Sequence, residues 1–191
     1  MRPAFNFTNL LKLSLLDPKQ AGQSILSYDL SYEAICSIFA AAICASTSMM
    51  FAIDLLYETE GPSLTKVSTP WVFALLVGVM TLVVCGAISW TGQRFSGQGH
   101  FKSILTIVAW LQVVQMFMQM ASFLVMVILT PLVGIVQFGI FLWSLWIFVA
   151  FIDAAHGYNN MVKASLVALL GSGLGSIAMI AMIALISTLG R

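Results

Sequence analysis

Long apolar stretches, separated by short polar segments, dominate this chain. A helix needs about 20 residues to cross a bilayer core about 30 Å thick. Inside hydrocarbon every backbone N–H and C=O has to be paired within its own segment, which predicts helices, and the short alternating strands of a membrane barrel are not visible in the pattern. The predicted fold is all-α, a polytopic membrane helix bundle with five transmembrane helices over residues 34–56, 70–90, 103–130, 131–152 and 164–189.

The third and fourth stretches meet at Thr130-Pro131. Proline lacks a hydrogen-bond donor and disfavours a helical residue before it, so this dipeptide predicts a very tight hairpin. The alternative is one long helix kinked at Pro131, which would leave four spans. Five spans are favoured because about 50 residues is too long for a single crossing. The third stretch alone exceeds one span and is expected to tilt or to project past the membrane face.

Residues 1–33 are predicted to form a cytoplasmic, interfacial N-terminal segment, and residues 34–191 the five-helix transmembrane domain. Asp17-Pro18 is typical of a helix start, with an N-cap residue before a proline at the first helical position. It predicts a short interfacial helix through Ile25. The apolar run over residues 5–16 spreads around a helical wheel and is expected to dip into the headgroups. The pattern of a removable signal peptide is not apparent.

Composition also places the chain in lipid. Of its 191 residues, 60% are hydrophobic and 8% are charged, whereas about a quarter of a soluble domain is charged. The net charge of +1 provides no field that would hold nucleic acid. A soluble enzyme and a disulfide scaffold are equally excluded. Cys36, Cys44 and Cys85 lie in apolar stretches without CxxC spacing, so no metal, redox site or cofactor is expected.

Basic residues near the span ends set the expected orientation. With five helices, the N-terminal segment and the loops around residues 91–102 and 153–163 share one side of the membrane. That side carries six of the eight Lys and Arg residues. The N-terminus is therefore expected in the cytoplasm and the C-terminus outside.

The most distinctive polar feature is a row of carboxamides, Gln112, Gln115 and Gln119, in the third stretch. At about 100° per residue they fall within one narrow arc of a helix. A carboxamide that faces lipid would leave two donors and an acceptor unpaired, so this row is expected to face protein or a wet cavity. Interhelical hydrogen bonding is the simpler interpretation, since no charge accompanies the row. A polar substrate path is the alternative.

The fifth stretch contains the string Gly171-Ser172-Gly173-Leu174-Gly175-Ser176. It has neither the preceding strand nor the following Lys-Ser/Thr of a phosphate loop. Leu170 occupies the place of the first glycine in a Gly-x-Ser-Gly motif, which argues against an intramembrane serine protease. Gly171 and Gly175 make a small-xxx-small step, with Ser172 and Ser176 on a neighbouring face, and predict close packing of another helix.

Two polar pairs are candidate contacts at the cytoplasmic face. Asp153 and His156 are three residues apart at the end of the fourth stretch. Two residues are too few for a metal site, so solvation at the interface or a helix-end hydrogen bond is the simpler interpretation. His100 and Lys102 follow a Gly-rich loop. They would meet lipid phosphates or a partner, or form a hydrated connection.

Several features of this layout occur together in one family. They are the Asp17-Pro18 segment, the loop ending in His100-Phe101-Lys102, the run Tyr-Asn-Asn-Met-Val-Lys-Ala over residues 158–164, and the small-residue fifth stretch. Over nearly its whole length the chain resembles the Yip family, the Ypt/Rab-interacting proteins and their prokaryotic relatives. The Asp-Leu-Tyr-Gly-Pro hallmark of eukaryotic members is not present as such. The resemblance implies a compact bacterial inner-membrane protein that acts without catalysis, through partners in membrane organisation or trafficking.

Two functions therefore remain open. The first is an interaction or membrane-organising module of the Yip type, whose partners are the lipid bilayer and other membrane proteins or a second copy of the chain. The second is a small transporter or channel component in which the carboxamide row lines a polar path. The inverted repeats and broken helices common in transporters are not evident, which favours the first. An enzyme acting on lipid lacks a matching acid, base or metal cluster.

Overall fold

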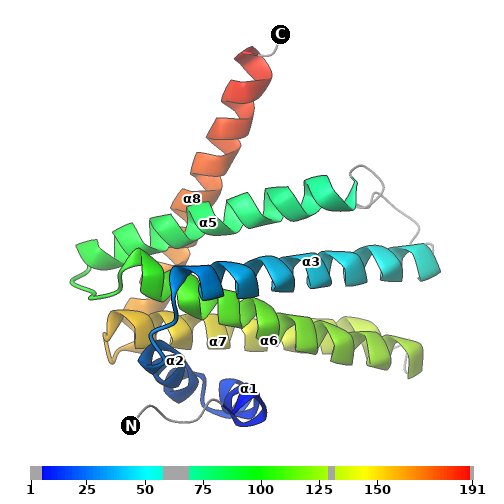
Figure 1. Cartoon of the computed structure of the whole chain (residues 1–191), viewed down its shortest axis with the longest axis horizontal. Helices are drawn as coiled ribbons and strands as arrows, with labels where there is room; N and C mark the ends of the chain where they lie inside the picture. Colours follow the sequence, from blue (N-terminus) through cyan, green and yellow to red (C-terminus); the bar gives the residue numbers. More distant parts are fainter. Residues whose placement is uncertain (1–5, 58–68, 129–131, 190–191) are drawn as a thin grey trace.

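The computed structural model describes residues 6–57, 69–128 and 132–189, and these parts of the chain are helical with no strand (Figure 1). Five of the helices are long and apolar enough to cross a membrane, which confirms the predicted all-α fold with five spans. The helices are α1 (Phe7–Leu16), α2 (Pro18–Ser27), α3 (Tyr32–Tyr57), α5 (Pro70–Arg94), α6 (Phe101–Ile128), α7 (Val133–His156) and α8 (Met161–Leu189).

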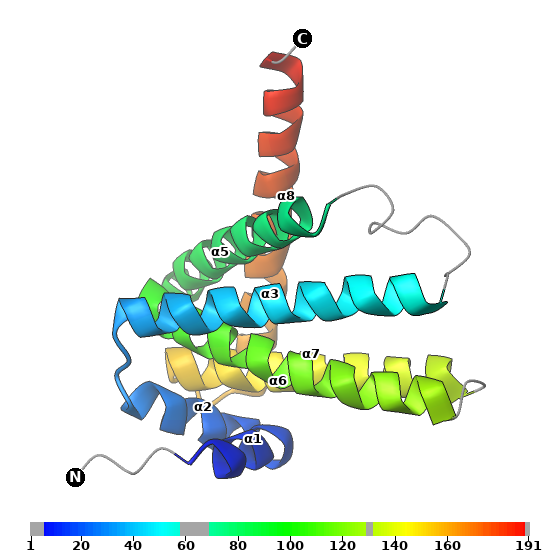
Figure 2. The ribbon, with the colours of Figure 1, turned by 45° about the vertical axis from the view of Figure 1, so that its right-hand side comes forward.

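The third and fourth spans are two separate helices. α6 ends at Ile128 and α7 begins at Val133, and the two lie side by side in both views (Figures 1 and 2). One long helix kinked at Pro131 is therefore excluded. The Thr130-Pro131 hairpin itself falls outside the described residues.

The N-terminal segment contains two helices rather than the one that was predicted. Asn6 caps α1 by accepting from the backbone N–H of Asn9 at 3.1 Å. Asp17 ends α1, since its backbone N–H donates to the carbonyl of Leu13. It also begins α2, because its side chain accepts from the N–H of Gln20 at 3.1 Å. The predicted N-cap is thus confirmed, and one residue at the joint defines two helices.

Helix α1 packs against the spans in addition to lying at their ends. The indole N–H of Trp110 in α6 donates to the buried hydroxyl of Ser14 at 2.8 Å. That hydroxyl donates to the carbonyl of Leu10 at 2.8 Å. The ring of Phe7 meets Trp110 edge-on, with centroids 5.5 Å apart. These contacts join α1 to α6, with the polar atoms of Ser14 and Trp110 paired.

The five long helices do not form a single parallel bundle. α3, α6 and α7 run side by side, with α1 and α2 beneath one end (Figure 2). α8 packs mainly on α5, and its C-terminal half extends away from the other spans in both views (Figures 1 and 2). The apolar side chains on that half, such as Ile177 and Ile180, are exposed.

The tightly packed core lies in the half of the molecule that contains α1 and α2. There the final turns of α5 and α7 meet the first turns of α3, α6 and α8, and their buried side chains include Ile35, Ile88, Ile104, Ile147, Phe151 and Val167. At the opposite ends, large apolar side chains are exposed, among them Leu55, Trp71, Ile128 and Ile135. These surfaces require lipid around them.

Candidate functional site

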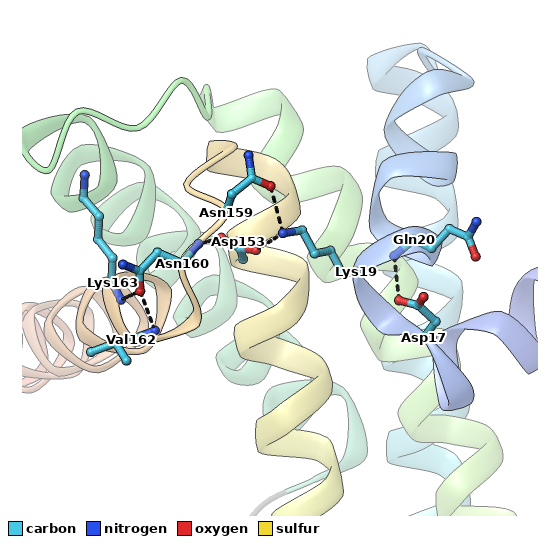
Figure 3. Close-up of polar contacts among 8 residues, drawn as sticks. All are labelled: Asp17, Lys19, Gln20, Asp153, Asn159, Asn160, Val162 and Lys163. Carbon is cyan, nitrogen blue, oxygen red and sulfur yellow. Dashed lines mark hydrogen bonds and ion pairs between the residues drawn. The ribbon is translucent and has the colours of Figure 1, made fainter.

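Asp153, in the last turn of α7, is the centre of a buried polar cluster beside α2. Its side chain is fully buried, and the ammonium of Lys19 lies 2.8 Å from its Oδ2. Its Oδ1 accepts from the backbone N–H of Asn160 at 3.1 Å. A buried carboxylate is tolerated only when it is paired and hydrogen-bonded. Figure 3 shows how this one carboxylate joins α2, α7 and the segment that leads into α8.

The same cluster organises the start of α8. Lys19 also donates to Oδ1 of Asn159 at 2.9 Å, and Asn159 has a left-handed backbone (φ 50°), which asparagine tolerates better than most residues. Oδ1 of Asn160 accepts from the backbone N–H groups of Val162 at 3.0 Å and Lys163 at 3.2 Å (Figure 3). Asn160 therefore caps α8 while its own N–H binds Asp153.

His156, the last residue of α7, is enclosed by glycines in the last turn of α5 and in the loop that connects α5 to α6. Its side chain is 2% exposed, and its Nδ1 accepts from the N–H of Gly99 at 3.1 Å. Because Nδ1 accepts, the ring is neutral and its proton is on Nε2. A Cβ at Gly97 or Gly99 would lie 2.5 or 2.6 Å from a ring atom, and one at Gly92 would overlap the ring. Only glycine leaves room for the imidazole at these three positions.

Tyr158 completes this enclosure on the other side of the ring. It stacks on His156 with centroids 5.1 Å apart, and its hydroxyl donates to the carbonyl of Gly92 at 2.6 Å. Burial raises the pKa of the Tyr158 phenol and so favours the protonated donor. The N–H of Gln98 donates to the carbonyl of His156 at 3.1 Å. The Gly-rich loop is thus held against α7 on its glycine side, while Ser96, Gln98 and His100 are exposed.

Asp153 and His156 lie in one helical turn but bind different parts of the molecule. Asp153 holds α2 and the start of α8, whereas His156 holds the α5–α6 connection. Neither is solvated at the interface, because both are buried. Within the described residues, no group of three or more His, Cys, Asp or Glu residues could hold a metal ion. Chemically, the arrangement positions helix ends relative to one another.

The second candidate pair, His100 and Lys102, lies outside this buried cluster. The ammonium of Lys102 is 2.7 Å from Oδ1 of Asp29, and the Asp29 side chain is 75% exposed. Such a surface pair contributes little to stability. The side chain of His100 is exposed. Lys102 therefore links the start of α6 to the turn between α2 and α3, and His100 is accessible from outside the bundle.

The carboxamide row faces the inside of the bundle. Gln112, Gln115 and Gln119 are half-buried and line a cavity of about 450 Å³ between α3, α6 and α7. Their side chains form no hydrogen bond with any residue that the structure describes. The row was expected to face protein or a wet cavity, and in the structure it lines this cavity. Interhelical hydrogen bonds from these carboxamides, the simpler interpretation, are not seen in the described chain.

The small-residue step of α8 lies at its crossing with α5. A Cβ added at Gly171 would lie 2.7 Å from Cα of Ile88, and one at Gly175 would lie 2.9 Å from Cα of Val84. The two backbones therefore approach closely enough to require glycine. Ser172 donates to the carbonyl of Ala168 in its own helix at 2.6 Å, and Ser176 is half-buried.

Sequence reasoning did not identify Lys19, Gly92 or Tyr158 as parts of a site. Lys19 and Asp153 are far apart along the chain, and a single sequence contains no pattern that predicts their pairing. The glycine spacing was a usable signal, since three glycines at positions 92, 97 and 99 precede a span. It indicates that something approaches the backbone there, but not that the approaching group is His156.

Comparison with known protein families gives a match over most of the chain. Residues 12–186 match the family model described as the Yip1 domain. This range begins in α1, includes α2 with Lys19, and extends through the described spans into α8. No curated protein and no solved structure shows significant similarity to the chain.

Proposed function

This chain belongs to the Yip1 domain family, and we propose that it acts in the bilayer as a non-enzymatic interaction module that organises other membrane proteins or further copies of itself. It is an integral membrane protein with five apolar helices. The observation that carries the proposal is the polar cluster around Asp153 and His156. Through it, contacts at one end of the molecule join α2, α5, α7 and α8.

That end forms a preorganised platform, defined here as α1, α2, the loop over residues 95–100 and the segment over residues 157–160. A docking surface binds more tightly when it is already ordered, because less conformational entropy is lost on association. The platform is held by hydrogen bonds and one ion pair rather than by apolar packing alone. Such a surface suits a protein that positions partners.

We propose that the platform faces the cytoplasm of a bacterial cell and that the chain lies in the inner membrane. Lys12, Lys19, Arg94, Lys102 and Lys163 all lie at or next to this end of the described helices. The excess of basic residues favours the cytoplasmic side. Residues 1–33 would then form the cytoplasmic, interfacial segment, and the C-terminus would lie outside.

Photocrosslinking in cells tests the module directly. A photoreactive amino acid is placed at Gln23 or His100, which are exposed on the platform, and at the exposed Leu124 of α6 as the lipid-facing control. We expect discrete protein adducts from the two platform positions and mainly lipid adducts from position 124. The adducts should weaken when Lys19→Met disturbs the cluster. Protein adducts that are absent from the platform, or that form equally at position 124, would contradict the proposal.

A transporter or channel component is the second candidate function, and the carboxamide-lined cavity is the observation that favours it. The test replaces Gln115 and Gln119 by Leu. Suppose that the purified variant keeps its oligomeric state and thermal stability while the flux of small polar solutes into proteoliposomes disappears. This result would support the transport function. If wild-type protein produces no flux above empty liposomes, transport is rejected.

A further inference from the structure

Two cavities inside the bundle share a wall. The cavity of about 450 Å³ between α3, α6 and α7 carries the carboxamide row. A second cavity of about 320 Å³ lies between α5, α6 and α7. Both are lined by Gln112, Gln115 and Ser144. The two volumes therefore adjoin at these side chains.

The two cavities differ in chemistry. The first is lined by Gln115, Gln119, Gln137 and several serines alongside methionines. Beyond the shared wall, the second is lined mainly by apolar side chains, among them Val77, Val84, Leu111, Phe141, Leu145 and Phe148. We call the first the polar cavity and the second the apolar cavity. No charged residue is among those that line either one.

Their order along the bundle is fixed by the helices. On α6 the apolar cavity involves residues 108–115, and the polar cavity continues to residue 126, near the end remote from α1 and α2. From the middle of α6, where the two overlap, the polar cavity extends toward the end remote from α1 and α2 and the apolar cavity toward the core. A lipid of the leaflet at that end has the same order, with its headgroup toward the membrane surface and its chains toward the midplane.

Toward the platform, the space is closed by packing. Ile88, Ile104 and Phe151 are fully buried. They belong to α5, α6 and α7, the helices that line the apolar cavity, and lie about one helical turn nearer the platform than the residues that line it. A ligand that enters from the half remote from the platform therefore meets a closed floor, which favours a binding site over a continuous passage.

We infer that the joined cavities bind a neutral lipid whose headgroup carries hydroxyl groups, with the headgroup against the carboxamide row and one acyl chain in the apolar cavity. Carboxamides donate and accept, so they pair with hydroxyl groups in either sense. A phosphate would be buried among uncharged groups without a counter-ion, at a high desolvation cost. A cavity of this size lies within the usual range for small-molecule sites, about 300–1,000 Å³.

The ligand also accounts for the unpaired carboxamides. Gln112, Gln115 and Gln119 form no hydrogen bond to the described residues, although each is half-buried in a helix that crosses lipid. Unpaired amides at that depth are costly. Headgroup hydroxyls would satisfy them where acyl tails could not.

The test uses the full chain in mild detergent and native mass spectrometry. The probes are monoglucosyl diacylglycerol, phosphatidylglycerol and phosphatidylethanolamine with identical acyl chains, and glucose as the headgroup without chains. We expect the glycolipid to bind at least about tenfold more tightly than either phospholipid, and glucose not to bind. Equal binding of the three lipids, or preference for phosphatidylglycerol, would overturn the inference. If free glucose, which has no acyl chain, bound as tightly as the glycolipid, the proposed role of the apolar cavity would be wrong.

Variants separate the two halves of the site. Gln115→Met with Gln119→Met preserves side-chain length and removes the polar groups, and we expect about a tenfold loss of glycolipid affinity. Val77→Phe, at the wall of the apolar cavity, should lower the binding affinity for all three lipids by a similar factor. Gln23→Leu, on the exposed face of α2, is the matched control and should change nothing. If the double Met variant fails to fold, Gln119→Met alone decides: an unchanged glycolipid preference in that variant overturns the inference.

The lipid site is independent of the proposed function. Gln115→Met with Gln119→Met should leave the protein adducts from position 23 intact. Lys19→Met should leave glycolipid binding intact. The lipid site and the interaction module can therefore be rejected separately, because each is tested by its own variants and its own measurement.

Discussion

At the residue scale, the interior of this membrane protein contains polar side chains in two distinct situations. The Asp153 carboxylate and Nδ1 of His156 are buried with partners, whereas Nε2 of His156 is buried without a hydrogen-bond partner among the described residues. Gln112, Gln115 and Gln119 are half-buried beside a cavity. The first situation stabilises one arrangement of helix ends, and the second leaves hydrogen-bonding capacity for a ligand.

Removing the ammonium from the buried ion pair should be costly. Lys19→Met leaves the Asp153 carboxylate buried without its cation, and because Lys19 is itself about one-third exposed, we expect a loss of about 2–3 kcal/mol in the free energy of unfolding. Unfolding in mixed detergent micelles, followed by circular dichroism, measures it. Lys102→Met, which removes an exposed pair with Asp29, is the control and should cost less than about 0.5 kcal/mol. Equal effects of the two substitutions would refute the importance of the buried pair.

The glycine enclosure of His156 gives a second expectation. Gly92→Ala places a methyl group where the imidazole lies and should reduce the free energy of unfolding by about 2 kcal/mol or more. Gly86→Ala, on the same helix and with nothing within 4 Å of the added Cβ, should be close to neutral. His156→Ala in the Gly92→Ala background should recover part of the loss, because the clashing ring is gone. Additive losses in the double variant would show that the two positions do not interact.

Little of this residue-scale picture could be predicted. Asp153 and His156 were recognisable as a polar pair at a span end, but their burial depends on Lys19 and on glycines from other segments. The row of carboxamides was predictable because helical periodicity alone places its three members on one face. Which helices cover that face depends on tertiary packing.

At the element scale, the helices follow closely from hydropathy, and the differences have local causes. Each span extends beyond its apolar stretch where the flanking polar residues still favour a helix, as α5 does in continuing to Arg94. The division of the N-terminal segment at Asp17 was half predicted, since the start of α2 was evident. α1 is stabilised by contacts with α6, and a wheel of its own sequence does not reveal them.

The crossing of α5 and α8 depends on glycine. Gly171→Val would push a side chain into the backbone of α5 at Ile88 and should separate the two helices. Engineered cysteine pairs across the crossing should then crosslink several-fold more slowly than in the parent. Gly173→Val, on the same helix with open space around it, should leave the crosslinking rate unchanged. A similar rate in both variants would contradict close backbone contact.

At the scale of the whole molecule, polar contacts join the segments at the end that contains α1 and α2, whereas the carboxamide-lined cavity extends toward the other end. The number of spans and the side expected to face the cytoplasm follow from apolar length and from the distribution of Lys and Arg. The inclination of α8 and the cavities do not, because they depend on which helix faces pair.

The proposed orientation has its own test. Single cysteines introduced at Lys12 or Lys102, in a variant without the native cysteines, should react with a membrane-impermeant maleimide only after the inner membrane is opened. A cysteine added after Arg191 should react in intact spheroplasts. Labelling in the reverse pattern would place the platform outside the cell.

The central claim is that the polar face of α6 lies inside the protein while its apolar face meets lipid, and spin-label accessibility along this helix tests it most directly. Nitroxides at Gln115 and Gln119 are compared with nitroxides at Phe117, Met120 and Leu124, which are exposed on α6. In proteoliposomes, we predict high collision rates with dissolved oxygen at positions 117, 120 and 124, and several-fold lower rates at positions 115 and 119. High oxygen collision rates at positions 115 and 119 would place the carboxamides in the acyl chains and contradict the account.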